Sequence, residues 1–141
     1  MNLTLLSAFA RFGAKPHNRH RGLSAIATDG AMVLNCWHAY FGNPERGVLR
    51  YEDRLSREPP QSKHMGLLGE HLALARDGEL PVRMVVTTQA DGKIRGFHVR
   101  PDLIGRVVQF DGDHFIVDFT RREETPLVTP KSLGALGRKS R

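Results

Sequence analysis

Hydrophobic residues recur at helix-like and strand-like spacings over most of the first 120 residues. Leucines and phenylalanines three and four positions apart predict an amphipathic helix over residues 3–12. A second helix is predicted from Ser62, a suitable N-terminal cap, to Arg76, with Gly78 following its end. Elsewhere, runs of branched and apolar residues predict strands, and Asp-Gly pairs between such runs predict hairpins.

These hairpins centre on three Asp-Gly pairs, at 29–30, 91–92 and 111–112. The first pair suits a tight type I′ turn. Residues 42–61 are polar, charged and interrupted by prolines, which predicts a long surface loop. The expected fold is therefore α+β, with an antiparallel, hairpin-rich sheet of about five strands and two helices packed on one face.

The length of the chain predicts its domain organisation, and its single cysteine and apolar runs predict its surroundings. We expect one domain over residues 1–120, followed by a basic, flexible C-terminal tail over 121–141. Cys36 has no cysteine partner in the chain, which favours a reducing, cytoplasmic compartment. No apolar run approaches the roughly 18 residues of a membrane-spanning helix, so no membrane partner is expected.

Positive charge is concentrated at the two ends of the chain. Residues 1–28 hold four Lys/Arg and no Asp/Glu, whereas residues 29–120 hold 11 Lys/Arg against 13 Asp/Glu. Residues 121–141 again carry an excess, with six Lys/Arg against two Asp/Glu. A nearly neutral body with two basic peripheral segments is the pattern expected of a surface that meets a polyanion.

This charge pattern predicts a small, basic, non-catalytic protein that binds nucleic acid through the 11–21 loop and the tail. Arg46, Arg50, Arg54 and Arg57 recur every three or four residues and would share one face if their segment were helical. The residues expected to contact phosphates, some of them from this segment, are Arg11, Lys15, His17, Arg19, His20, Arg21, Arg50, Arg54, Arg121, Arg122 and Lys131.

Two other functions remain open. The basic surface also suits a protein-interaction module, an inhibitor or adaptor that binds an acidic partner. A small metal-independent ribonuclease is the third possibility, because a histidine acid–base pair and a nearby cation suffice for RNA cleavage. His17, His20 or His38 with Lys15 or Arg19 would supply these groups. The choice between DNA and RNA and the oligomeric state also stay open.

The sequence assigns no catalytic residue, metal ligand or cofactor site. It contains no Walker-type or GxGxxG phosphate loop, and the HxxH formed by His17 and His20 lacks further ligands nearby. The segment CWHAYF, read as a strand, places Cys36, His38 and Tyr40 on one face. Trp37 is expected to lie in the core, with stacking on bases as the alternative, and Cys36 is expected to be a buried structural cysteine.

Three segments carry a resemblance to known sequences. FGAKPHN after a first helix, then LSAIATDG, then a strand containing CW, resemble a family of small bacterial proteins without an assigned activity. The resemblance covers roughly residues 5–119. It implies a compact, stand-alone domain of bacterial or mobile-element origin, and it implies no site residue or activity.

Overall fold

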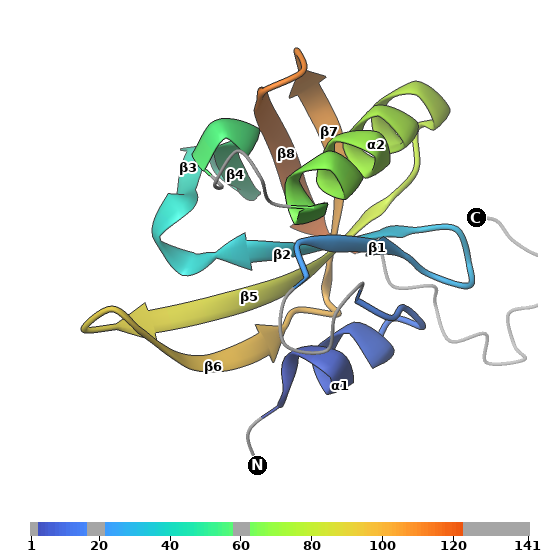
Figure 1. The fold of residues 1–141 in the computed structure, drawn as a ribbon. Coiled ribbons are helices and arrows are strands. Elements are labelled where there is room, and N and C mark those ends of the chain that lie inside the picture. The colour runs from blue at the N-terminus through green and yellow to red at the C-terminus, as the bar shows by residue number, and fades with distance from the viewer. Residues whose placement is uncertain (1–2, 17–21, 58–62, 123–141) are drawn as a thin grey trace, which may run out of the picture.

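A computed structural model of the protein describes residues 3–16, 22–57 and 63–122 (Figure 1). Two α-helices, two short 3₁₀ helices and eight strands make up this part of the chain. In chain order they are α1 (Leu5–Ala10), β1 (Ser24–Ile26), β2 (Met32–Trp37), η1 (His38–Tyr40), β3 (Phe41–Glu45), β4 (Val48–Arg54), η2 (Leu55–Arg57), α2 (Lys63–Gly78), β5 (Val82–Ala90), β6 (Lys93–Val99), β7 (Leu103–Phe110) and β8 (His114–Arg121).

The strands form one sheet in the order β1-β2-β5-β7-β8-β4-β3, with β6 paired to β5. Every pair is antiparallel except β2–β5, which is parallel. The α+β class is confirmed, but the expected count of about five strands is too low and the purely antiparallel sheet is wrong. β2 and β5 can pair in parallel because the long connection between them contains β3, β4 and α2.

Much of the missing strand content lies in residues 42–61, where a loop was expected. Most of β3 and all of β4 come from this segment. In β4 the side chains alternate, with Tyr51 and Asp53 buried and Glu52 and Arg54 exposed. A strand is normally recognised by alternating apolar and polar residues. Here Asp53, a charged residue, takes one of the inward positions, so the alternation is not visible in the sequence. The same backbone shows that Arg46, Arg50, Arg54 and Arg57 do not share a helix face.

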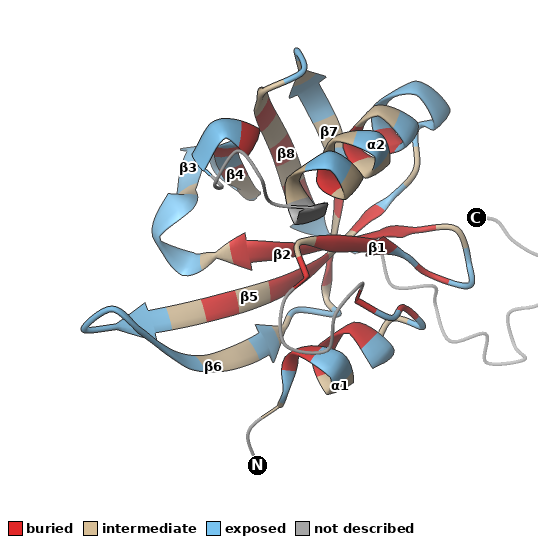
Figure 2. Cartoon of the chain, viewed as in Figure 1, coloured by how far each residue is buried: buried red, intermediate tan, exposed pale blue. Residues whose placement is uncertain are grey.

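The two helices lie on opposite faces of the sheet, not on one face (Figures 1 and 2). Met32 and Leu34 of β2 belong to the core under α2, whereas Val33 between them belongs to a second core under α1. Every residue from Ala31 to Cys36 is buried. Continuous burial of this kind is typical of a strand that is covered on both faces.

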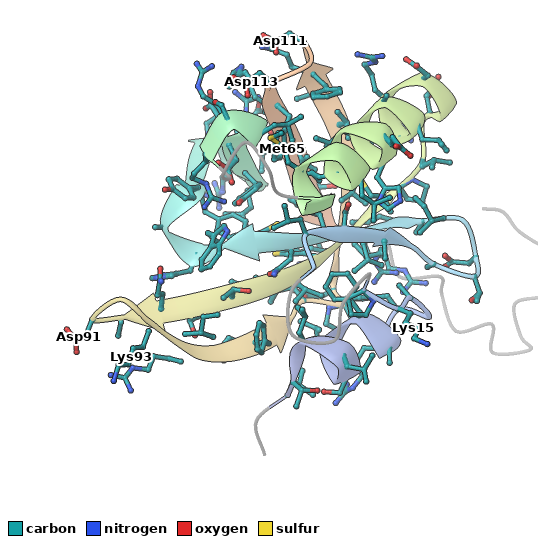
Figure 3. All side chains as sticks on the ribbon, in the orientation of Figure 1. Lys15, Met65, Asp91, Lys93, Asp111 and Asp113 are labelled. Carbon is teal, nitrogen blue, oxygen red and sulfur yellow. The ribbon has the colours of Figure 1, made fainter. Side chains whose placement is uncertain are left out.

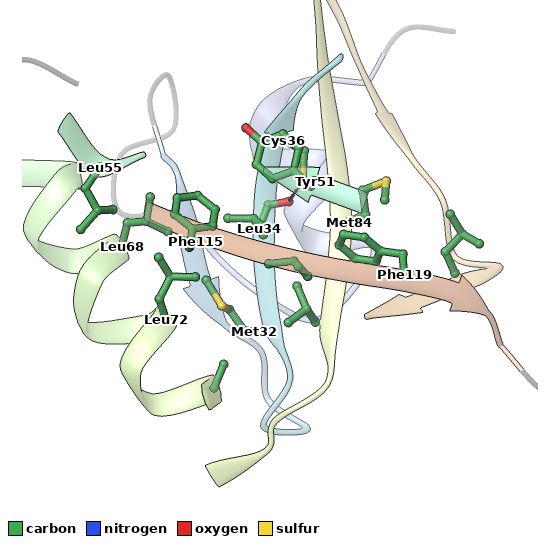
Figure 4. Close-up of a cluster of buried hydrophobic side chains, with 14 residues drawn as sticks. Met32, Leu34, Cys36, Tyr51, Leu55, Leu68, Leu72, Met84, Phe115 and Phe119 are labelled. Atoms are coloured by element: carbon green, nitrogen blue, oxygen red, sulfur yellow. Dashed lines mark hydrogen bonds between the residues drawn. The ribbon is translucent and has the colours of Figure 1, made fainter. Parts of the chain in front are cut away.

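The larger core packs against α2 and draws on strands that are not neighbours in the sheet (Figure 4). It joins side chains from β2, β4, β5, β7 and β8 with the inner face of α2. Tyr51 of β4 is 1% exposed and crosses this core to β2, where its hydroxyl accepts a hydrogen bond from the backbone N–H of Trp37 at 3.1 Å. Since β2 and β4 are separated by three strands in the sheet order, this bond shows that the sheet curls and brings the start of η1 against the middle of β4.

The helix ends and turns follow the sequence in most details. Thr4 caps α1 in a capping box with Ser7, and α2 begins at Lys63, one residue after the expected cap. Asp91 and Gly92 both have positive φ, as a type I′ turn requires. At 29–30 only Gly30 does, and the β1–β2 turn spans residues 27–31, so the type I′ prediction fails there. At the end of α2 the left-handed residue is Glu79, because Gly78 continues the helix.

Candidate nucleic-acid interface

Most arginines of the central body are paired with carboxylates. Arg50 makes two hydrogen bonds to Asp118, at 2.7 and 2.9 Å. Six further arginines form ion pairs, most of them at the surface: Arg54–Asp113, Arg57–Asp53, Arg76–Asp77, Arg95–Asp91, Arg100–Asp102 and Arg106–Glu79. The near-neutral charge of residues 29–120 therefore reflects arginines and carboxylates that lie next to one another in the fold.

A second group of cations has no such carboxylate. Within the described residues, none of its side chains makes a direct ion pair, although the Asp102 carboxylate acts on Arg121 and that of Asp29 acts on Arg83 at longer range. All but the half-buried Arg83 are exposed. We name this group the basic corner; it consists of Arg11, Lys15, Arg83, Arg121 and Arg122.

Arg83 lies between the end of α1 and the end of β8. It stands near the start of β5, and its guanidinium carbon lies 4.7 Å from the centroid of the Phe12 ring, just after α1. Its Nη2 donates a hydrogen bond to the carbonyl of Pro101 at 2.9 Å. The adjacent Asp102 carbonyl accepts from the backbone N–H of Arg122 at 2.7 Å. The end of α1 and the end of β8 therefore meet on either side of Arg83.

The electrostatics of Arg83 are unfavourable for a cation. Burial lowers its pKa, the positive charge of Arg122 lowers it further, and Asp29 opposes both. Its Nε is a buried donor without a hydrogen-bond partner in the described part of the chain. A bound anion would relieve the repulsion between like charges, and Arg is well suited to pair with phosphate.

The structure brings together only part of the residue set expected from the sequence. Arg122 lies close enough to Arg83 to lower its pKa, and Arg121 precedes Arg122 in the chain. Arg11 and Lys15 stand on either side of Phe12 in the sequence, and Lys15 also lines a hollow with Ser24 and His71. Arg50 and Arg54 lie on β4 instead, each paired with an acid. The remaining members lie outside the described residues: His17, Arg19, His20, Arg21 and Lys131. The segment 17–21 is flanked by Pro16 and Gly22, which touch, since a Cβ on Gly22 would come within 2.7 Å of the Pro16 Cβ.

Arg83 was not predicted as a site residue, although the sequence around it gives an indication. It is the only charged residue in the strand sequence VRMVVTT, where its neighbours are buried. A lone arginine inside a largely buried strand is uncommon unless it is paired or meets a ligand.

A separate hollow lies where η1, β4, η2 and the start of β8 come together. It has a volume of 390 Å³ and is lined by Tyr40, Glu52, Asp53, Arg54, Ser56, Arg57 and His114. The Tyr40 ring is 43% exposed, and the Arg57 guanidinium carbon lies 4.9 Å from its centroid and 5.3 Å from that of Trp37. The expected alternation along CWHAYF fails here, because β2 ends at Trp37 and the chain turns into η1.

Asp53 organises this hollow. Its carboxylate accepts two hydrogen bonds from Arg57, at 2.6 and 2.7 Å, one from the Tyr51 hydroxyl at 2.7 Å and one from the Arg54 backbone N–H at 2.8 Å. Burial, opposed by the stronger combined effect of Asp53 and the nearby tyrosines, leaves the pKa of Arg57 raised. Burial also raises the pKa of Tyr51, and Cys36 and Asp53 raise it further.

The other candidate groups give weaker indications of chemistry. Cys36 is fully buried, and burial, followed by the charge of Asp53, raises the pKa of its thiol. His71 shares a 2.7 Å hydrogen bond with the buried Ser24 hydroxyl, and burial lowers its pKa. Among residues 3–16, 22–57 and 63–122, no group of three or more histidines, cysteines or acids could hold a metal ion. None of the helices described there is long and apolar enough to cross a membrane.

Comparisons with known proteins add little to this geometry. No protein-family model and no curated protein matches the chain, so the resemblance to a bacterial family stays a prediction. Among solved structures, the chain is weakly similar to the DNA recognition domain of the cytosine modification-dependent restriction endonuclease LpnPI, with 14% sequence identity and a TM-score of 0.31. The similarity covers 77% of this chain and 60% of that one. At this level it carries no argument, and the interface rests on the side chains described above.

Proposed function

We propose that this protein binds nucleic acid without catalysis, and that phosphates contact the basic corner. The observation that carries the proposal is the position of Arg83 between Phe12 and Arg122. It unites the ends of α1 and β8, from which the two basic segments of the chain continue, and no carboxylate among the described residues pairs with these cations.

The mode of binding follows from the chemistry of the basic corner. Lysine and arginine displace condensed counterions from phosphates, which gives affinity that is independent of sequence and falls steeply with salt. Lys15 and Arg122 are exposed and free of ion pairs within the described residues, so a phosphate gains their charge without breaking an existing pair. The paired arginines Arg50 and Arg54 would first have to release Asp118 and Asp113.

The test is fluorescence anisotropy with a labelled 12-nucleotide DNA strand, its duplex and the matching RNA, at 50 and 200 mM salt. We expect Lys15→Gln and Arg122→Gln each to weaken binding about threefold or more at low salt. Lys93→Gln is the matched control, because Lys93 is also exposed and lies at the tip of the β5–β6 hairpin, far from Lys15 (Figure 3). Equal losses at all three positions, or no binding at low salt, would contradict the proposal.

The same experiment separates the acidic-partner alternative. A protein that recognises an acidic protein should be retained by that partner after nuclease treatment, and its affinity for nucleic acid should not depend on the basic corner. Loss of retention on nuclease treatment, together with the expected effect of Lys15→Gln, supports nucleic acid.

A further inference from the structure

The hollow beside η1 has no role in phosphate contact at the basic corner. Two of its lining side chains are negative and two are positive, namely Glu52 and Asp53 against Arg54 and Arg57, with His114 close to Glu52. This balance gives little selectivity for an anion. Its volume of 390 Å³ falls in the range of about 300–1,000 Å³ typical of small-molecule sites.

The walls of the hollow present two flat groups that are held in place. Asp53, whose side chain is 6% exposed, fixes the Arg57 guanidinium through two hydrogen bonds. The guanidinium in turn lies over the rings of Tyr40 and Trp37. An aromatic ring and a guanidinium plane are the two protein groups on which unpaired bases stack.

Polar atoms complete the hollow beside these flat groups. Glu52 is half exposed, and one of its carboxylate oxygens, Oε2, is bonded to His114 Nε2 at 2.5 Å. The Ser56 hydroxyl is oriented by a 3.1 Å hydrogen bond to Asp113. These lining side chains suit a neutral planar group with hydrogen-bonding atoms along its edge better than they suit a phosphate.

We propose that the hollow binds one unpaired nucleobase, stacked against Tyr40 and Arg57 with its edge toward Glu52. This inference rests on the proposed function, because it concerns the same nucleic acid that contacts the basic corner. Trp37 pairs in register with Thr87, four residues along β5 from Arg83. Arg83 and the strand position opposite Trp37, whose ring lies against Arg57 of the hollow, are therefore about 13 Å apart along β5. A single strand of 12 nucleotides, about 40 Å long when stacked, exceeds that separation.

The test compares two 12-nucleotide strands that differ only in their bases, an oligodeoxycytidine and an abasic strand with the same phosphates. Wild-type protein should bind the intact strand about tenfold more tightly, within the range that base–aromatic stacking gives. Tyr40→Ala should abolish this difference and leave affinity for the abasic strand unchanged, whereas Tyr40→Phe should preserve it. Lys15→Gln should weaken both strands and keep their ratio.

Intrinsic fluorescence supplies a readout that needs no substitution. Trp37 is the only tryptophan in the chain and lies under Arg57, so a base in the hollow should change its emission while the abasic strand should not. Equal affinity for the two strands, or a difference that survives Tyr40→Ala, would overturn the inference and leave the proposed function standing. Failure of both strands to bind at low salt would overturn both proposals.

Discussion

Replacing Asp53 with Asn should destabilise the protein more than any other single change of charge in the described body. The substitution keeps the volume of the side chain but removes its negative charge and places an amide N–H₂ group among four donors. Arg57 then loses the negative charge of Asp53, and the Tyr51 hydroxyl and the Arg54 backbone N–H compete for the one remaining oxygen.

The magnitude follows from the burial of the two partners. Removing one partner of a buried ion pair costs about 3–5 kcal/mol. The Asp53 side chain is 6% exposed but Arg57 is 29% exposed, so water offsets part of the loss and we expect about 3 kcal/mol. With a urea m-value of about 2 kcal/mol per molar, the unfolding midpoint falls by about 1.5 M.

Urea unfolding followed by circular dichroism measures this loss. Asp91→Asn is the matched control, because the Asp91 side chain is 91% exposed and 3.7 Å from Arg95, so its loss should cost less than about 0.5 kcal/mol. The double variant Asp53→Asn/Arg57→Gln should be more stable than the sum of the two single losses predicts. A cost below about 1 kcal/mol for Asp53→Asn, or simple additivity of the two changes, would refute this account of the hollow.

Three further predictions concern packing, thiol chemistry and pH. Gly105→Ala should lower the free energy of unfolding by about 1–3 kcal/mol, because the new Cβ would lie 2.6 Å from Phe119 Cδ1. Gly66→Ala, where the new Cβ meets nothing within 4 Å in helix α2, should raise it by up to about 1 kcal/mol; equal effects in thermal melts would contradict both. Cys36 should resist iodoacetamide at pH 8 until the protein is unfolded, because burial raises the pKa of its thiol; mass spectrometry showing rapid native labelling would disprove this. Burial, opposed by Glu70, lowers the pKa of His71 below 6.5, so its contribution to stability is complete above about pH 6.5 and is lost as the pH falls through the folded pKa. His71→Asn should therefore flatten the difference in urea midpoint between pH 7.5 and 5.5, and an unchanged difference would show that another group controls it.

Local patterns in the sequence were enough to predict both helices and the β1–β2 and β7–β8 hairpins, and they offered the β5–β6 turn while leaving β6 open. Each of these hairpins joins neighbouring apolar runs through an Asp-Gly turn, so its pairing needs no information from distant residues. The strand β4 was not predicted because Asp53 occupies an inward position where an apolar residue is expected. Its carboxylate is tolerated there only because Arg57, Tyr51 and a backbone N–H bond to it, and those contacts depend on the folded chain.

The placement of the helices and of the basic residues also depended on long-range contacts. Alternate side chains of β2 and β5 point to opposite faces of the sheet, one covered by α2 and the other by α1. The sequence did not reveal this, because the parallel pairing of the two strands was not predicted. The charge excess at the chain ends led to the prediction of Lys15 and Arg122 as phosphate contacts, which stays a prediction. Arg83 was not predicted, because its contacts with Phe12 and Pro101 join residues distant in sequence. Arg50 and Arg54 were expected to contact phosphates because their acidic partners, Asp118 and Asp113, lie more than 50 positions away.

The salt dependence of binding tests the role of the basic corner most directly. For a 12-nucleotide single strand, the logarithm of the association constant should fall linearly with the logarithm of salt concentration, by about 0.7 for each phosphate neutralised. The double variant Lys15→Gln/Arg122→Gln should reduce the magnitude of that slope by about 1.4, while Lys93→Gln should leave it at the wild-type value. A slope that is the same in all three proteins would contradict the assignment of phosphate binding to this corner.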